Sequence, residues 1–103
     1  MGGNQMNEYQ KKAATFRVEG SPNEERVMGL LAEAGEVAGV FQKLLRGGMD
    51  PVDAEMNLYK ELGDVMWYVS QIAVDNGWDL QGIADANISK LTARKERGTL
   101  VTR

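Results

Sequence analysis

The chain of 103 residues contains no cysteine and no histidine. Without cysteine it can form neither disulfides nor thiolate metal sites. Without histidine it lacks the usual general base, the usual partner of a serine nucleophile and the imidazole ligands of zinc and di-iron sites. Any metal chemistry in this chain must therefore use oxygen ligands.

Long apolar runs and excess basic charge are also missing. No apolar stretch approaches the roughly 18 residues needed to cross a bilayer, and the polar start MGGNQMNEYQKK is not typical of a signal peptide. The formal net charge is -3, which gives no reason to expect nucleic acid as a partner. We therefore expect a cytoplasmic protein without membrane or nucleic-acid partners, and a single domain over residues 1–103.

Only two prolines are present, and each follows a residue that favours a helix start. Ser21 and Pro22 predict an N-cap and a first helical residue, and Glu24 completes a capping box with Ser21. Asp50 and Pro51 repeat the start signal. Two long helices are therefore expected to begin at these prolines.

Apolar residues at spacings of three and four predict helices along most of the chain, and no convincing strand. We expect four helices, over residues 7–16, 22–46, 51–75 and 79–97, with Asp79 as the cap of the fourth. Short connections favour antiparallel packing of the long neighbours. The sequence therefore predicts an all-α fold, an antiparallel helical bundle of about four helices.

Two of the predicted helices each carry a pair of acids spaced i and i+3. Glu33 and Glu36 flank the apolar arc of the second helix. Glu61 lies inside the apolar arc of the third helix, and Asp64 lies at its edge. Burying a carboxylate is unfavourable unless it is paired, protonated or bound to a cation. If the second and third helices face one another, the four carboxylates surround one cavity, and the sequence predicts an all-oxygen site for Mg²⁺ or Mn²⁺, with Ca²⁺ a looser fit. The alternative is that these acids are ordinary solvated surface residues.

The fourth predicted helix places one amide and two cations on one face. Asn87, Lys90 and Arg94 are spaced i, i+3 and i+7, and they share a face with Ile83 and Leu91. Beside a carboxylate cluster these groups suit a polyphosphate, because metal ions bridge phosphate oxygens while cations neutralise further charge. The alternative is that these are solvated charges that happen to align.

These motifs occur together in one known family. Glu33-x-x-Glu36, followed after 24 residues by Glu61-x-x-Asp64, resembles the ExxE…ExxD signature of the MazG-like, all-α nucleoside triphosphate pyrophosphohydrolases. The segments LAEAGEVAGVFQK and KELGDVMWYVSQIA resemble the two metal-binding helices of that family, and NISKLTARKERG resembles its third motif. NEYQKKAATF is similar to the leading helix of small members, so the resemblance covers about residues 7–98.

The resemblance implies Mg²⁺-dependent hydrolysis of (deoxy)nucleoside triphosphates between the α and β phosphates, giving monophosphate and pyrophosphate, in nucleotide-pool housekeeping. It implies that the four acids of the two motifs bind Mg²⁺, with Mn²⁺ as a substitute, and that one glutamate orients or deprotonates the attacking water. Lys90 and Arg94 would hold the phosphates, and Asn87 would approach the sugar or phosphate end. Two alternatives stay open: a catalytically silent bundle that binds nucleotide or metal, and a purely structural helical dimer.

The third predicted helix has a second apolar stripe. Met56, Gly63, Trp67 and Val74 lie together, away from Glu61. A helix that is apolar on two faces must bury both. We therefore expect a homodimer or a homotetramer built as a dimer of dimers; the alternative is that Trp67 packs under the N-terminal helix.

Three aromatic residues near predicted helix ends are candidates to stack on a nucleotide base. They are Tyr9, Phe16 and Trp78. Aromatic residues at such positions also commonly belong to the core, so the sequence does not identify the preferred base.

Overall fold

A computed structural model describes residues 5–98, and both ends of the predicted domain, residues 1–4 and 99–103, lie outside the described residues. The described residues form four α-helices and no strand, which confirms the predicted all-α class. The helices lie within two residues of the predicted ranges: α1 (Gln5–Ala14), α2 (Asn23–Leu45), α3 (Pro51–Asp75) and α4 (Leu80–Glu96). Over this part of the chain, no helix combines the length and the apolar character that a membrane crossing requires.

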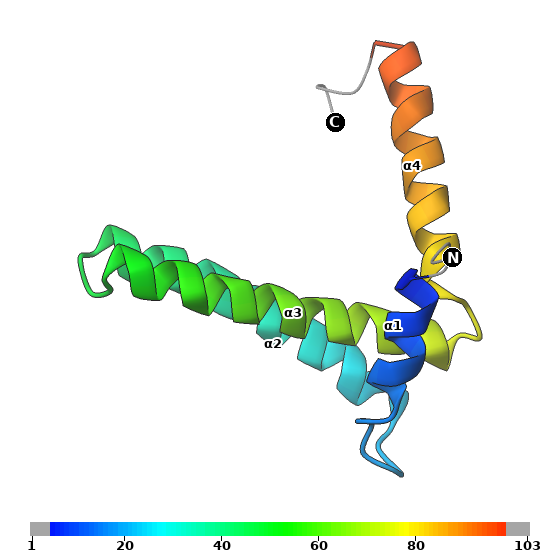
Figure 1. The fold of residues 1–103 in the computed structure, drawn as a ribbon, viewed down its shortest axis with the longest axis horizontal. Coiled ribbons are helices and arrows are strands. Elements are labelled where there is room, and N and C mark those ends of the chain that lie inside the picture. The colour runs from blue at the N-terminus through cyan, green and yellow to red at the C-terminus, as the bar shows by residue number, and fades with distance from the viewer. Residues whose placement is uncertain (1–4, 99–103) are drawn as a thin grey trace.

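The two long helices α2 and α3 pair along their length as an antiparallel hairpin (Figure 1). Gly47, with φ 77°, allows the chain to reverse after α2. Asp50 then caps α3 as predicted, because its Oδ2 accepts a hydrogen bond from Val52 N at 3.2 Å while Pro51 occupies the first turn. Local start and stop signals therefore account for the hairpin.

The start of α2 differs from the prediction. Its N-cap is Pro22, and no side chain caps it. Ser21 Oγ instead donates to Val18 O at 2.9 Å and accepts a hydrogen bond from Arg26 Nη1 at 2.7 Å. The predicted capping box is therefore wrong, because the Ser21 hydroxyl is turned toward a buried arginine.

A buried amide joins α1 to both α3 and α4. Gln10 Nε2 donates to the carbonyls of Ser70 at 3.2 Å and Trp78 at 3.0 Å. Its Oε1 accepts a hydrogen bond from Leu80 N, at the start of α4, at 2.9 Å. Since these contacts use both ends of the Gln10 amide, they fix where α4 starts. From that point α4 extends away from the hairpin (Figure 1).

Trp67 lies under α1. Its Nε1 donates to Ala13 O at 3.0 Å, and its ring meets the Tyr68 ring edge-on with centroids 5.0 Å apart. The alternative reading of Trp67, packing under the N-terminal helix, is therefore confirmed, and the expected association of chains stays a prediction. Met56 of the same predicted stripe is 58% exposed.

The buried apolar core of the described residues is small. It consists of Ala13, Val40, Ala54, Ala73 and Leu80. Four polar residues are buried as deeply: Gln10, Arg26, Ser70 and Gln71. The radius of gyration is 16.5 Å, against about 13 Å for a compact chain of this length. A single copy therefore leaves much of its apolar surface exposed.

Candidate metal centre

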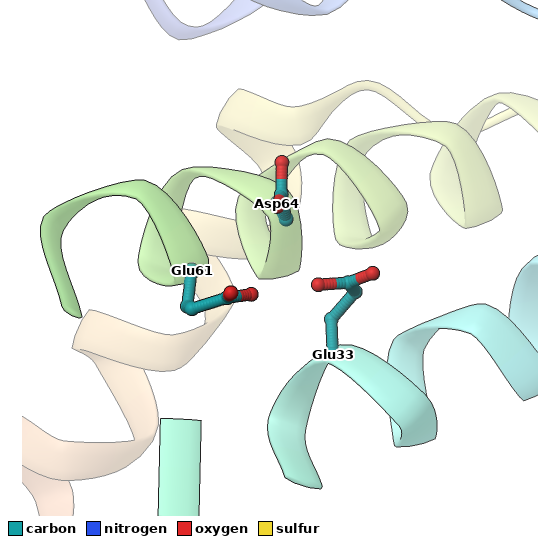
Figure 2. A group of neighbouring side chains, drawn as sticks. All are labelled: Glu33, Glu61 and Asp64. Carbon is teal, nitrogen blue, oxygen red and sulfur yellow. The ribbon is translucent and has the colours of Figure 1, made fainter. Parts of the chain in front are cut away.

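Three of the four predicted acids meet between α2 and α3. Glu33 comes from α2, whereas Glu61 and Asp64 come from α3 (Figure 2). One carboxylate oxygen of each lies within 4.8 Å of those of the other two. Figure 2 shows the carboxylates of Glu33 and Glu61 directed toward one another, with Asp64 beside them. We call these three residues the carboxylate cluster.

Helix geometry explains why these acids come together. Glu61 and Asp64 are spaced i and i+3, so they lie on the same side of α3. One turn further along α3, the Tyr68 ring covers Gly29, which lies one turn before Glu33 on α2. A Cβ atom added to Gly29 would lie 2.3 Å from Tyr68 Cε1. The two helices are therefore in close contact one turn away from the carboxylate cluster.

The electrostatics of the cluster are unfavourable in the absence of a cation. Burial raises the pKa of Glu33, a hydrogen bond to the Glu61 carboxylate raises it further, and so do the negative charges of Asp64, Glu61 and Glu36. A raised carboxyl pKa means that its surroundings disfavour the ionised form. A cation bound among these groups would remove that penalty.

One carboxylate oxygen of the cluster, Glu61 Oε1, is buried without a hydrogen-bond partner among the described residues. Leaving a buried acceptor unpaired costs about 1–3 kcal/mol, and more for a charged group. The ion pairs that the described residues form with one another both involve Asp75, so no basic side chain is seen to neutralise the cluster. Three carboxylates and an unpaired buried oxygen fit a hard divalent cation such as Mg²⁺ or Mn²⁺.

Glu36, the fourth predicted acid, lies outside the cluster. It is exposed on α2, and its negative charge is one of the causes that raise the pKa of Glu33. The charge of Glu36 therefore affects the ionisation of Glu33, although the Glu36 carboxylate is not one of the three in the cluster. A role for Glu36 as a metal ligand stays a prediction.

The predicted phosphate-binding residues lie on α4. Asn87 and Lys90 are exposed, and Arg94 is half-buried. Asn87 lines an apolar groove of about 470 Å³ together with Leu62 and Val65, the sequence neighbours of the two α3 acids. The second half of α4, which carries Lys90 and Arg94, extends away from the hairpin (Figure 1). Within one chain, the structure does not gather these three residues around the carboxylate cluster.

One of the three aromatic candidates lies near the acids. Burial raises the pKa of Tyr9, and the negative charge of Asp64 raises it further. α1 thus places a neutral phenol near the cluster. Phe16 and Trp78 are 68% and 59% exposed, and neither stacks on another ring among the described residues.

A second acid, Asp75, is buried in an ion-pair network that the sequence did not predict. Asp75 Oδ1 accepts from Arg17 Nη2 at 2.6 Å, and Asp75 Oδ2 accepts from Arg26 Nε at 2.6 Å. The hydrogen bond from Arg26 lowers the pKa of Asp75, and the hydrogen bond and charge of Arg17 lower it further. One signal was present in the sequence: Asp75 ends a long helix, where a negative charge is unfavourable unless something compensates it.

Known proteins resemble this chain over most of its length. The sequence pattern of the MazG nucleotide pyrophosphohydrolase domain matches residues 22–99, which include both acid motifs and α4. The chain is also similar to the Gene 37 protein of Mycobacterium phage L5, with 43% identity over 75 residues. That match covers 71% of this chain and 66% of the phage protein, slightly less than two thirds of its length. No solved structure matches the chain.

Proposed function

The chain belongs to the MazG nucleotide pyrophosphohydrolase family, and we propose that it hydrolyses (deoxy)nucleoside triphosphates between the α and β phosphates. The products are the nucleoside monophosphate and pyrophosphate. The observation that supports this most strongly is the buried, unpaired Glu61 Oε1 within a cluster of three carboxylates. The corresponding cellular role is housekeeping of the nucleotide pool in the cytoplasm by a single MazG-like domain.

In this proposal the carboxylate cluster holds the divalent cation, Mg²⁺ or Mn²⁺. Glu33, Glu61 and Asp64 supply oxygen ligands, and Glu36 adds a further ligand or a negative charge nearby. A bound divalent ion polarises phosphate oxygens and lowers the pKa of a coordinated water. The mutual approach of the carboxylate oxygens and the lack of a basic partner among the described residues both support this assignment.

The same glutamates supply the proton acceptor. Glu33 and Glu61 face one another from different helices (Figure 2), so either can orient a water molecule between them. As the water oxygen bonds to the α phosphorus, one glutamate takes a proton from it. The bond from the α phosphorus to the bridging oxygen breaks, and that oxygen leaves with the pyrophosphate. The absence of histidine does not prevent this reaction, because phosphoryl transfer depends mainly on positioning and charge.

The residues of α4 bind the substrate in this proposal. Lys90 and Arg94 hold the phosphates, and Asn87 approaches the sugar or phosphate end. Because the second half of α4 extends away from its own hairpin, these residues reach a carboxylate cluster when α4 moves or when two chains associate. We accordingly propose that the working enzyme is a homodimer or a homotetramer, and the large exposed apolar surface supports association.

The test is product analysis with a panel of ribo- and deoxynucleoside triphosphates, in Mg²⁺ and in EDTA. The proposal requires pyrophosphate and the matching monophosphate in equal amounts, and only when metal is present. Release of inorganic phosphate with the diphosphate would contradict the proposed bond. Nucleotide or metal binding without turnover would favour the catalytically silent bundle, and no stabilisation by Mg²⁺ plus nucleotide would favour the structural dimer.

A further inference from the structure

Gly29 differs from the other glycines of α2. The helix contains Gly29, Gly35 and Gly39, although glycine is a poor helix former. A Cβ atom added to Gly35 or Gly39 would meet nothing within 4 Å. One added to Gly29 would lie 2.3 Å from Cε1 of Tyr68 and 2.8 Å from its hydroxyl oxygen. Among these three glycines, it is Gly29 whose missing side chain allows α3 to come close.

The Tyr68 ring that occupies this space is held by contacts outside the hairpin. It meets the Trp67 ring edge-on, with centroids 5.0 Å apart and an angle of 87° between the ring planes. Trp67 Nε1 in turn donates to the carbonyl of Ala13, a buried residue of α1, at 3.0 Å. A turn of the Tyr68 ring away from Gly29 would therefore disturb its contact with a ring that is tied to α1.

Contacts between α2 and α3 lie on both sides of the carboxylate cluster. On one side, the cluster is one turn away from Gly29 in α2 and one turn away from Tyr68 in α3. On the other side, toward the hairpin turn, Val40 and Ala54 are both buried and both line a groove of about 220 Å³ between the helices. Because packed interiors resist compression, these contacts fix the separation of the helices at the cluster.

The separation of the helices sets the space between the carboxylates. Glu33 comes from α2, whereas Glu61 and Asp64 come from α3 (Figure 2). Mg²⁺ binds oxygen ligands at about 2.0–2.1 Å in a nearly octahedral arrangement, whereas Ca²⁺ binds them at about 2.3–2.6 Å in more variable arrangements. Carboxylates that are held at a fixed distance by two helices can therefore discriminate between these ions by size.

From these observations we propose that Gly29 and Tyr68 form a spacer, whose contact fixes the distance between α2 and α3 so that the carboxylate cluster prefers Mg²⁺ to the larger Ca²⁺. Both are positioning residues, because neither supplies a ligand and each acts on the cation through the helix that carries the ligands. The inference rests on the proposed metal site, and it adds which residues determine the cation that the site accepts.

The test is competition of Mg²⁺ and of Ca²⁺ against Mn²⁺, followed by the paramagnetic signal of the free Mn²⁺. It gives the ratio of the Mg²⁺ and Ca²⁺ affinities without requiring turnover. Gly29→Ala pushes the helices apart next to the cluster, and we expect the ratio to shift toward Ca²⁺ by about tenfold. Gly39→Ala, the matched control with nothing near the added Cβ, should keep the wild-type ratio. Circular dichroism gives the helix content of each variant.

A second set of variants changes the other side of the contact. Tyr68→Phe keeps the ring and should keep the wild-type ratio. Tyr68→Leu removes the ring, so the helices are no longer held at one distance, and the ratio should again shift toward Ca²⁺. Adding Gly29→Ala to Tyr68→Leu should change the ratio little further, because the new methyl group no longer meets a ring.

A wild-type ratio in Tyr68→Leu would overturn the spacer, even if Gly29→Ala alone did not fold. Equal weakening of both affinities in the variants would overturn it as well, because a general loss of structure lowers both affinities without changing their ratio. In either case saturable Mn²⁺ binding by wild type would leave the proposed metal site in place. No saturable binding by wild type would overturn the metal site and the spacer together.

Discussion

Two acidic sites lie between helices of this chain, a single aspartate and the carboxylate cluster, and the described ion pairs involve only the aspartate. At the end of α3, Asp75 receives hydrogen bonds from Arg17 and Arg26, both at 2.6 Å. In the middle of the hairpin, the carboxylate cluster has no basic partner among the described residues, and one buried oxygen of Glu61 has no donor at all. Among residues 5–98, arginines therefore pair with the acid that is structural, and no described ion pair involves the acids where we propose an external cation.

The pKa values of Asp75 and Glu33 are shifted in opposite directions. Hydrogen bonds from the two arginines lower the pKa of Asp75, whereas burial and neighbouring carboxylates raise the pKa of Glu33. Ionised Asp75 therefore stabilises the fold, and ionised Glu33 destabilises the metal-free fold. A buried acid is thus informative about function only when its neighbours are known as well.

The largest expected effect is on turnover at the cluster. Glu61→Gln removes a ligand charge and a candidate proton acceptor while keeping the shape of the side chain, and we expect metal-dependent pyrophosphate release to fall by about 100-fold or more. The helix content should stay near that of wild type, because a neutral amide relieves the repulsion between the buried acids. The matched control is Glu55→Gln, an exposed acid on the same helix outside the cluster, which should keep its activity. A fully active Glu61→Gln enzyme would remove Glu61 from the site.

The second-largest expected effect is on the free energy of unfolding when Asp75 is replaced. Asp75→Asn leaves Arg26 buried with a weaker partner, and breaking a buried ion pair typically lowers the free energy of unfolding by about 3–5 kcal/mol. Urea denaturation measures the change, and Glu19→Gln, in the exposed connection before α2, is the control. If Asp75→Asn were as stable as that control, the arginine contacts would not be holding α3 to the start of α2.

A smaller effect is expected where the helices approach one another next to the cluster. Gly29→Ala places a methyl group against the Tyr68 ring, and overpacking of this kind lowers the free energy of unfolding by about 1–3 kcal/mol. Gly39→Ala, on the same helix with nothing within 4 Å of the added Cβ, should raise it by up to about 1 kcal/mol. Thermal unfolding compares the two. Equal changes of the same sign would show that the Tyr68 contact does not set the distance between the helices.

The smallest effects are on the pH dependence of stability, and the two acids should give opposite signs. The folded pKa of Asp75 is lowered, so its stabilisation is complete above the unfolded value of about 3.9 and is lost as the pH falls through the folded pKa. The folded pKa of Glu33 is raised, so the metal-free protein loses stability as the pH rises from about 4.3 through the folded pKa. The measurement is the melting temperature in EDTA as a function of pH for wild type, Asp75→Asn and Glu33→Gln. Asp75→Asn should lack the loss of stability at low pH, and Glu33→Gln should lack the loss of stability as the pH rises above about 4.3. The same dependence of melting temperature on pH in all three proteins would contradict the pKa directions of both Asp75 and Glu33.

Local sequence signals predicted the helices and most of the acid site. Asp50 and Asp79 both cap the helices assigned to them, and Asp79 Oδ1 accepts from Gly82 N at 2.7 Å. Helical periodicity was also enough to place Glu61 toward α2, because its phase relative to the apolar arc depends only on residues nearby in sequence.

Long-range contacts decided what the sequence could not show. Arg26 lies 49 residues from Asp75, and Gln10 lies 70 residues from Leu80, so no local pattern links the partners. The Gln10 contacts fix where α4 starts, and they join residues that are far apart in sequence. Helical periodicity shows that Asn87, Lys90 and Arg94 share a face of α4, but it does not show the direction in which this face is turned. The Ser21 hydroxyl was misassigned for the same reason, since its acceptor role depends on the burial of Arg26.

Direct measurement of Mn²⁺ binding tests the carboxylate cluster most sharply. Titration with Mn²⁺, followed by the paramagnetic signal of the free ion, reports occupancy without requiring turnover or a known nucleotide. If the cluster is a metal site, wild type and Glu55→Gln should bind the ion saturably with matching affinity, and Glu61→Gln should bind it at least about tenfold more weakly. Equal affinity in all three proteins, or no saturable binding by wild type, would contradict the assignment of these acids to a cation.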